Sequence, residues 1–332
     1  MTSTVPQGIE DLAAGVRAGD RRALSRALSW IEDETHQGRA LLDRLYSPSP
    51  TAHRVGITGP PGSGKSTLTC ELTRAIRSHE GTVGVLAVDP TSPFTGGAIL
   101  GDRIRMQALA QDPGVFIRSM ATRGSLGGLA TTTYGASEAM EAAGCDWILI
   151  ETVGVGQSEM DVVEAVDTTI VVLVPESGDS VQAMKAGLLE AGDLFVINKF
   201  DREGGDRIEK EILLMIELER DRRASKNEWQ PRIFRTIATR GEGIEALRGG
   251  IEEHRAFLWR DPESWSARQD LRVAQRLRTL LRDRILHALW ASGRWDPWIA
   301  ECGRRVREGA ASPYALVDDL VARLMAGKGT EG

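Results

Sequence analysis

The sequence predicts an α/β fold in which helices flank a mostly parallel sheet. Short apolar runs rich in Val and Ile alternate with longer helical segments, a glycine-rich motif follows the first run, and an Asn-Lys-x-Asp motif follows a later one. Apolar runs with little polar alternation are typical of strands that are covered on both faces. Helices between such strands imply right-handed βα crossovers.

The composition excludes several classes of protein. The chain has 332 residues, of which 41% are hydrophobic and 27% charged, so neither a disordered nor a fibrous protein is expected. A net charge of -6 argues against nucleic acid or acidic membranes as partners. Cys70, Cys145 and Cys302 lie far apart, as expected for free thiols. Because we find no export signal and no apolar run near the ~18 residues of a membrane span, we expect a cytoplasmic protein.

The chain is expected to have three regions: an N-terminal helical segment (1–50), a nucleotide-binding domain (51–260) and a C-terminal helical arm (261–332). In the first region, apolar residues such as Ile9, Leu12 and Val16 recur at helical spacing. Prolines near its end stop the helical pattern. In the second region, strands are expected at residues 55–58, 83–88, 115–117, 147–150, 169–174, 194–197 and 233–237.

The third region carries an apolar stripe among many arginines, formed by Val273, Leu277, Leu280, Leu281 and Ile285. Two interpretations remain open. The stripe is either the inner face of a helical cap on the main domain or a dimerisation surface, because aromatic and arginine residues are enriched at protein interfaces.

The glycine-rich motif reads GPPGSGKS, follows the run at 54–58 and opens a helix expected at 67–78. Glycines let the backbone wrap a phosphate, and the helix N-terminus adds positive potential. Lys65 is expected to reach the β- and γ-phosphates, and the Ser66 hydroxyl to ligate Mg²⁺. The residues expected to hold the nucleotide phosphates are Gly59, Pro60, Pro61, Gly62, Ser63, Gly64, Lys65, Ser66 and Thr67. This motif indicates a P-loop NTPase.

The base is predicted by Asn198, Lys199 and Asp201, which follow the run at 194–197. A carboxylate can accept from N1–H and the exocyclic amine of guanine, whereas a buried Asp201 beside adenine would stay unpaired. Asn198 is expected to tie its loop to the phosphate loop, and the Lys199 stem to lie against the base. A small-residue loop at Thr236, Ile237 and Ala238 is expected to close over guanine. The predicted nucleotide is therefore GTP.

Further acidic residues follow predicted strands. Glu151 begins the sequence ETVG, where most GTPases have Asp, and Gly154 is placed to sense the γ-phosphate. Glu151, Asp89 and Asp102 are candidates for the magnesium site with Ser66, because ligands gather at the carboxyl ends of parallel strands.

A purely structural role also stays open for two of these acidic residues. Asp89 could be a surface-turn residue and Asp102 a helix N-cap. The glutamine that usually directs the attacking water is also missing, since Val155 follows Gly154 and the nearest glutamine is Gln157. We therefore expect slow basal hydrolysis that needs an added group.

Together, the segments GPPGSGKS, AVDP, TGGAILGDRIRM, ETVGVGQSE, NKFD and TRGEGIEAL resemble the MeaB/ArgK/MMAA family of P-loop GTPases. The resemblance covers roughly residues 5–260. It implies a GTPase chaperone that gates adenosylcobalamin loading and protects or reactivates an acyl-CoA mutase of the methylmalonyl-CoA mutase type, with the cofactor held by the mutase. It also implies a homodimer held by C-terminal helices, and an additional switch in which Lys185 matches a polar position.

The sequence leaves two alternative functions to compare with this one. A metal-insertion GTPase for nickel enzymes needs a Cys/His transfer site, and the five histidines are scattered without ligand spacing. A kinase acting on a transport protein needs a base that activates the acceptor, and none is recognisable.

Overall fold

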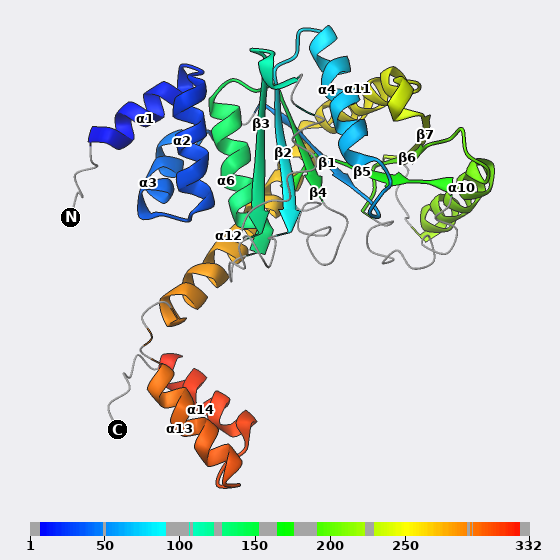
Figure 1. The fold of residues 1–332 in the computed structure, drawn as a ribbon. Helices are drawn as coiled ribbons and strands as arrows, with labels where there is room; N and C mark the ends of the chain where they lie inside the picture. Colours follow the sequence, from blue (N-terminus) through cyan, green and yellow to red (C-terminus); the bar gives the residue numbers. More distant parts are fainter. Residues whose placement is uncertain are drawn as a thin grey trace. The chain divides into compact units, whose positions relative to one another are not determined.

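The computed structural model describes residues 7–48, 51–90, 106, 109–122, 128–152, 165–175, 191–222, 229–290, 293 and 295–325 (Figure 1). Within these residues, seven parallel strands form one sheet in the order β3-β2-β4-β1-β5-β6-β7. The predicted α/β architecture is confirmed. The chain divides into two compact units, Met1–Leu277 and Arg278–Gly332.

Each of the seven apolar runs is a strand. The strands are β1 (His53–Thr58), β2 (Val83–Pro90), β3 (Val115–Thr122), β4 (Trp147–Thr152), β5 (Thr168–Leu173), β6 (Leu194–Asn198) and β7 (Arg232–Thr236). Several are longer than the apolar pattern indicated. Because β2 continues to Pro90, Asp89 lies inside that strand, opposite Ala121 of β3, and not in a turn after it.

The helices follow the segments with helical periodicity. They are α1 (Gln7–Arg17), α2 (Arg21–Glu32), α3 (His36–Leu45), α4 (Lys65–Ser78), α6 (Gly128–Ala142), α10 (Gly205–Arg222), α11 (Ile244–Arg260), α12 (Pro262–Trp290), α13 (Asp296–Arg307) and α14 (Pro313–Met325), with short 3₁₀ turns η1 (Leu109–Gln111) and η3 (Ala238–Arg240). Among the described helices, none combines the length and the apolar character that crossing a membrane requires.

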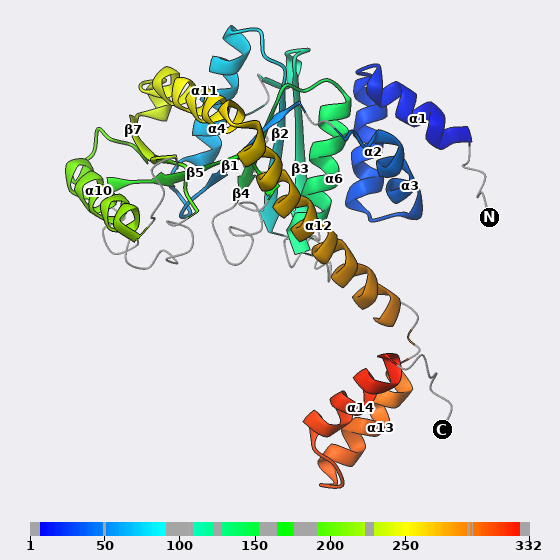
Figure 2. The same cartoon turned by 180° about the vertical axis from the view of Figure 1, so that it is seen from behind.

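The sheet is the middle of three layers. Successive residues of each strand point to opposite faces, and helices cover the apolar residues on both. On β4, Leu149 packs in a core with α4 and α11, whereas Ile148 and Ile150 pack in a core with α6. The face that carries α6 also carries α10, at the other half of the sheet (Figures 1 and 2). Both faces of the central strands are therefore buried, as their continuous apolar pattern predicts.

The N-terminal helices share a core with the sheet. Leu28 and Leu41 are buried beside Met140 of α6 in one apolar cluster, which continues to Ile148 on β4. Helix α2 starts cleanly because the Asp20 carboxylate accepts hydrogen bonds from two backbone N–H groups of the first turn. Helices α1 to α3 thus add a further layer over α6 (Figure 2).

The second unit contains the α13–α14 helix pair, within which Cys302 and Leu316 are buried. Along α12, the stripe residues Val273, Leu277, Leu281 and Ile285 are exposed to solvent. The three cysteines are free thiols, as expected. Burial raises the pKa of the Cys145 thiol to about 12, so this thiol stays protonated at neutral pH.

Candidate functional site

The phosphate loop joins the end of β1 to the start of α4, and its backbone conformation requires glycine at several points. Gly62 and Gly64 have φ values of +75° and +92°, in the left-handed region that side chains disfavour. At Gly59, a Cβ atom would lie 2.1 Å from the Val172 carbonyl oxygen of β5. The loop is thereby held against the sheet, and the backbone N–H groups at the start of α4 make this end of the helix suitable for an anion.

Lys65 is the first residue of α4, two residues earlier than the predicted helix start, and its side chain is buried. Its Nζ donates hydrogen bonds to the carbonyl oxygens of Gly59 at 2.8 Å and Pro60 at 3.0 Å. The ammonium group therefore lies folded across the loop, inside the ring of backbone groups that is suited to phosphate. Ser66 and Thr67 complete the first turn, where the helix dipole favours negative charge.

Glu151 lies on β4 opposite Ile57 of β1, close to the carboxyl edge of the sheet. Its position in the strand shares the alternation of Leu149, which faces α4, and this places the carboxylate beside that helix. The Ser66 hydroxyl donates to Glu151 Oε1 at 2.5 Å. The side chain is buried. The glutamate, one methylene longer than the usual aspartate, thus contacts the serine of the phosphate loop directly.

Asn198 ends β6 and connects three loops. Its Nδ2 donates to the Ser63 carbonyl at 2.8 Å, and its Oδ1 accepts from Thr236 Oγ1 and from the Ala238 N–H, each at 3.1 Å. Asn198 and Thr236 are both buried. The predicted tie between the base-reading loop and the phosphate loop is confirmed, and it extends to the closing loop that starts at Thr236.

Lys199 and Asp201 also contact the loops that Asn198 connects. Lys199 has a φ of +56° and donates from Nζ to the Gly62 carbonyl at 2.8 Å, so its stem spans the two loops. The expected burial of Asp201 is wrong, because 37% of its side chain is exposed and its Oδ2 lies 3.2 Å from Nη2 of Arg240.

Two contacts at the candidate site, one between threonines and one made by Arg240, were not predicted from the sequence motifs. Thr152 Oγ1 donates to Thr58 Oγ1 at 3.3 Å, which joins β4 to β1 just before the phosphate loop. Arg240, in the TRGEG segment, reaches Asp201 from the closing loop. The positive charge next to the small-residue loop could have indicated Arg240. The threonine pair gives no such signal, because it forms only when β4 and β1 are neighbours in the sheet.

Several predicted site residues lie outside the described residues, namely Asp102, Gly154, Gln157 and Lys185; for Asp89 only the backbone is described. Ile237 links η3 to β7, and its N–H donates to the Glu242 carbonyl at 3.1 Å. In the described part of the chain, no group of three or more His, Cys, Asp or Glu side chains is arranged to hold a metal ion.

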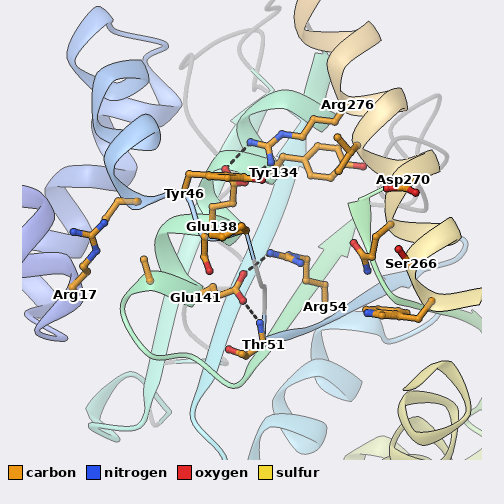
Figure 3. Close-up of a pocket in the computed structure, with 17 residues that line it drawn as sticks. Arg17, Tyr46, Thr51, Arg54, Tyr134, Glu138, Glu141, Ser266, Asp270 and Arg276 are labelled. Carbon is orange, nitrogen blue, oxygen red and sulfur yellow. Dashed lines mark hydrogen bonds and ion pairs between the residues drawn. The ribbon is translucent and has the colours of Figure 1, made fainter. Parts of the chain in front are cut away.

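A separate cavity of about 960 Å³ lies between α6, α12 and the segment that precedes β1. Figure 3 shows Arg54 pointing to Glu141 and Arg276 pointing to Glu138 in this cavity. Arg54 Nη2 lies 2.6 Å from Glu141 Oε2, and Arg276 Nη2 lies 2.6 Å from Glu138 Oε2. Because carboxylates neutralise both guanidinium groups, and because Arg54 lies near the start of β1, this cavity is not the phosphate site.

Comparisons with known proteins agree with this geometry. The family described as "Methylmalonyl Co-A mutase-associated GTPase MeaB" matches residues 24–294. The chain is 45% identical over 319 residues to a protein of Pyrococcus abyssi that carries the name GTPase, covering 96% of this chain and 98% of that protein. It is 34% identical over 331 residues to the mouse (Mus musculus) protein named "Methylmalonic aciduria type A homolog, mitochondrial", covering 94% and 79% of the two chains.

A solved structure titled "LAO/AO transport system kinase" has the same fold, with a TM-score of 0.68 and 26% identity, over 97% of this chain and 100% of that chain.

Proposed function

Because the chain belongs to the MeaB family of P-loop GTPases and is itself a GTPase, we propose that it is a GTP-dependent chaperone of an adenosylcobalamin-dependent acyl-CoA mutase. The observation that carries the nucleotide-dependent part of the proposal is the convergence on Asn198 of the phosphate loop with the loops proposed to read and to close over the base. The family description names methylmalonyl-CoA mutase as the associated enzyme.

The phosphates of GTP would be held by residues 59–67. Lys65, whose Nζ already lies inside the loop, would exchange its bonds to the Gly59 and Pro60 carbonyls for phosphate oxygens. This exchange replaces neutral acceptors by charged ones, so the ammonium group would then pair with groups of opposite charge. Lys65 would thus be ready for a nucleotide without a large rearrangement of the chain.

The donor set beside Lys65 fits Mg²⁺. A hydroxyl and a carboxylate 2.5 Å apart, Ser66 and Glu151, provide the oxygen ligands that this cation prefers. Ser66 would ligate the ion and Glu151 would orient Ser66 or a bound water, with Asp89 and Asp102 as further proposed ligands. When bound, the cation neutralises phosphate charge during hydrolysis.

Asp201 would accept two hydrogen bonds from guanine, and the Ala238 N–H, with the Thr236–Ala238 backbone, would close over the base. Support comes from the shared anchoring of these residues on Asn198 and from Lys199, whose stem spans the loops. Gly154 is proposed to contact the γ-phosphate, and Gln157 to act on the attacking water.

We infer that hydrolysis is slow until the mutase binds, because Val155 cannot orient a water molecule. A missing transition-state contact of the glutamine or arginine-finger kind is worth on the order of 10³–10⁵ in rate. Lys185 is the residue proposed to be repositioned by the mutase. GTP turnover would be measured with and without the purified mutase, for the wild type and Lys185→Ala. The variant should bind GTP normally and lose most of the stimulation; full stimulation would contradict the role of Lys185.

We propose that the chain divides into residues 1–50, 51–260 and 261–332, and that the last of these regions forms the dimer interface. The exposed apolar positions of α12 support a homodimer, since contiguous apolar surface marks sites of association. We propose that the dimer acts in the cytoplasm, and that adenosylcobalamin is bound by the mutase and not by this chain.

A further inference from the structure

Three contacts join the two loops that are proposed to surround guanine. At the inner end, Asn198 Oδ1 accepts a hydrogen bond from Thr236 Oγ1. In the middle, the Phe200 N–H donates to the Thr236 carbonyl at 3.1 Å. At the outer end, Arg240 Nη2 lies 3.2 Å from Asp201 Oδ2. The outer contact involves the very carboxylate that is proposed to read the base.

The backbone fixes both partners of this outer contact. The Arg240 N–H donates to the Ile237 carbonyl at 2.8 Å, and Gly241, with a φ of +71°, turns the chain directly afterwards. On the other side, the left-handed conformation of Lys199 starts the tight turn that contains Asp201, closed by a bond of 3.0 Å from the Arg202 N–H to the Lys199 carbonyl. The ion pair therefore connects two ordered turns.

The pair leaves room for guanine. Arg240 contacts Oδ2 of Asp201, and within the described part of the chain Oδ1 has no partner. Each carboxylate oxygen can accept two hydrogen bonds, so Asp201 can bind Arg240 and still accept from both N1–H and the exocyclic amine of the base. Arg240 thus holds the carboxylate in one direction without blocking it.

We propose that Arg240 is a positioning residue for base selection. It fixes the direction of the Asp201 carboxylate and thereby sets the preference for guanine over hypoxanthine, which lacks the exocyclic amine. The inference rests on the proposed function, because it assumes that Asp201 reads the base. With 58% of the Arg240 side chain exposed, the ion pair adds little to folding stability, so its effect is expected on base selection.

The test is calorimetric titration of the full-length protein with guanosine diphosphate and inosine diphosphate. The wild type should prefer guanosine diphosphate by roughly 10- to 100-fold, since inosine diphosphate offers the carboxylate one donor where guanosine diphosphate offers two. In Arg240→Gln this ratio should narrow about fivefold, mainly through weaker binding of guanosine diphosphate. Arg240→Lys should restore part of the ratio, because it restores the charge.

Arg232→Gln is the matched control. Arg232 is the first residue of β7, has a side chain 53% exposed and pairs with Glu253. Its substitution should leave the ratio unchanged. An unchanged or larger ratio in Arg240→Gln, with a native unfolding midpoint, would overturn the inference while the proposed function stands. A wild type that binds neither nucleotide would overturn the proposed function itself.

Discussion

The Ser66 hydroxyl and the Glu151 carboxylate form a hydrogen bond of 2.5 Å between the first turn of α4 and the end of β4. These residues are far apart in the sequence and meet because β1 and β4 are adjacent in the sheet. The extra methylene of glutamate lets the carboxylate reach the serine directly. If the proposed magnesium site lies here, we expect the magnesium dependence of GTP hydrolysis to be sensitive to this single side chain.

Glu151→Gln should raise the Mg²⁺ concentration needed for half-maximal GTP hydrolysis. The amide keeps the length and the acceptor oxygen but removes the charge, and loss of a residue that orients a metal ligand costs about 10- to 100-fold in affinity or activity. A magnesium titration of GTP turnover measures the effect. Glu151→Asp, which withdraws the carboxylate from Ser66, is the companion variant. Identical magnesium curves for wild type and Glu151→Gln would remove Glu151 from the site.

Lys65→Ala should lower GTP turnover by roughly 10²–10³, because the variant loses the cation that stabilises developing phosphate charge. The Lys65 ammonium bonds to loop carbonyls and not to core residues, so the fold should persist. Phosphate release gives the rate, and circular dichroism during heating checks the fold. Normal turnover would refute the assignment of the phosphate loop.

Asp201→Asn should shift the preference from guanine to xanthine nucleotides. The new amide can donate where xanthine presents a carbonyl, whereas it cannot accept both guanine hydrogens. Competition binding with guanosine and xanthosine diphosphates measures the change. Since Asp201 lies at the surface, the unfolding midpoint should hardly move. Unchanged preference would show that another residue reads the base.

Gly64→Ala should impair the site more than Gly62→Ala, although both glycines have positive φ. Both substitutions cost roughly 1–2 kcal/mol in backbone strain. A Cβ at Gly64 would lie 2.4 Å from Asn198 Nδ2, whereas one at Gly62 meets nothing within 4 Å. Urea unfolding and nucleotide titration compare the two, and the additional loss at Gly64 should appear in nucleotide affinity. Equal affinities would mean that the tie through Asn198 does not matter for binding.

Leu281→Asp should convert the proposed dimer into a monomer with the nucleotide site intact. The side chain is 61% exposed on α12, so the substitution leaves the fold of the monomer unchanged but places a charge in the apolar stripe. Leu214→Asp on α10, where the leucine is 58% exposed, is the control outside the arm. Light scattering gives the mass, and a wild type that is already monomeric would contradict the proposal.

The sequence predicted the strands and the phosphate loop because both depend on local patterns. The Val- and Ile-rich runs around Val55, Leu149 and Val171 are buried on both faces, so their apolar continuity could be read directly. The exposure of Asp201 could not be predicted, since it depends on how two turns meet around Asn198. The unit boundary at Leu277 was equally hidden, because it falls inside the continuous helix α12.

The strand order also governs when the site can form during synthesis on the ribosome. The strand that precedes the phosphate loop has β4 and β5 as its neighbours, and both are made long after it. The loop that is proposed to close over the base begins at Thr236, at the end of β7. At a translation rate of 5–20 residues per second, on the order of ten to thirty seconds separate Lys65 from Thr236. A nascent chain therefore carries its phosphate loop well before it carries the residues that are proposed to distinguish one base from another.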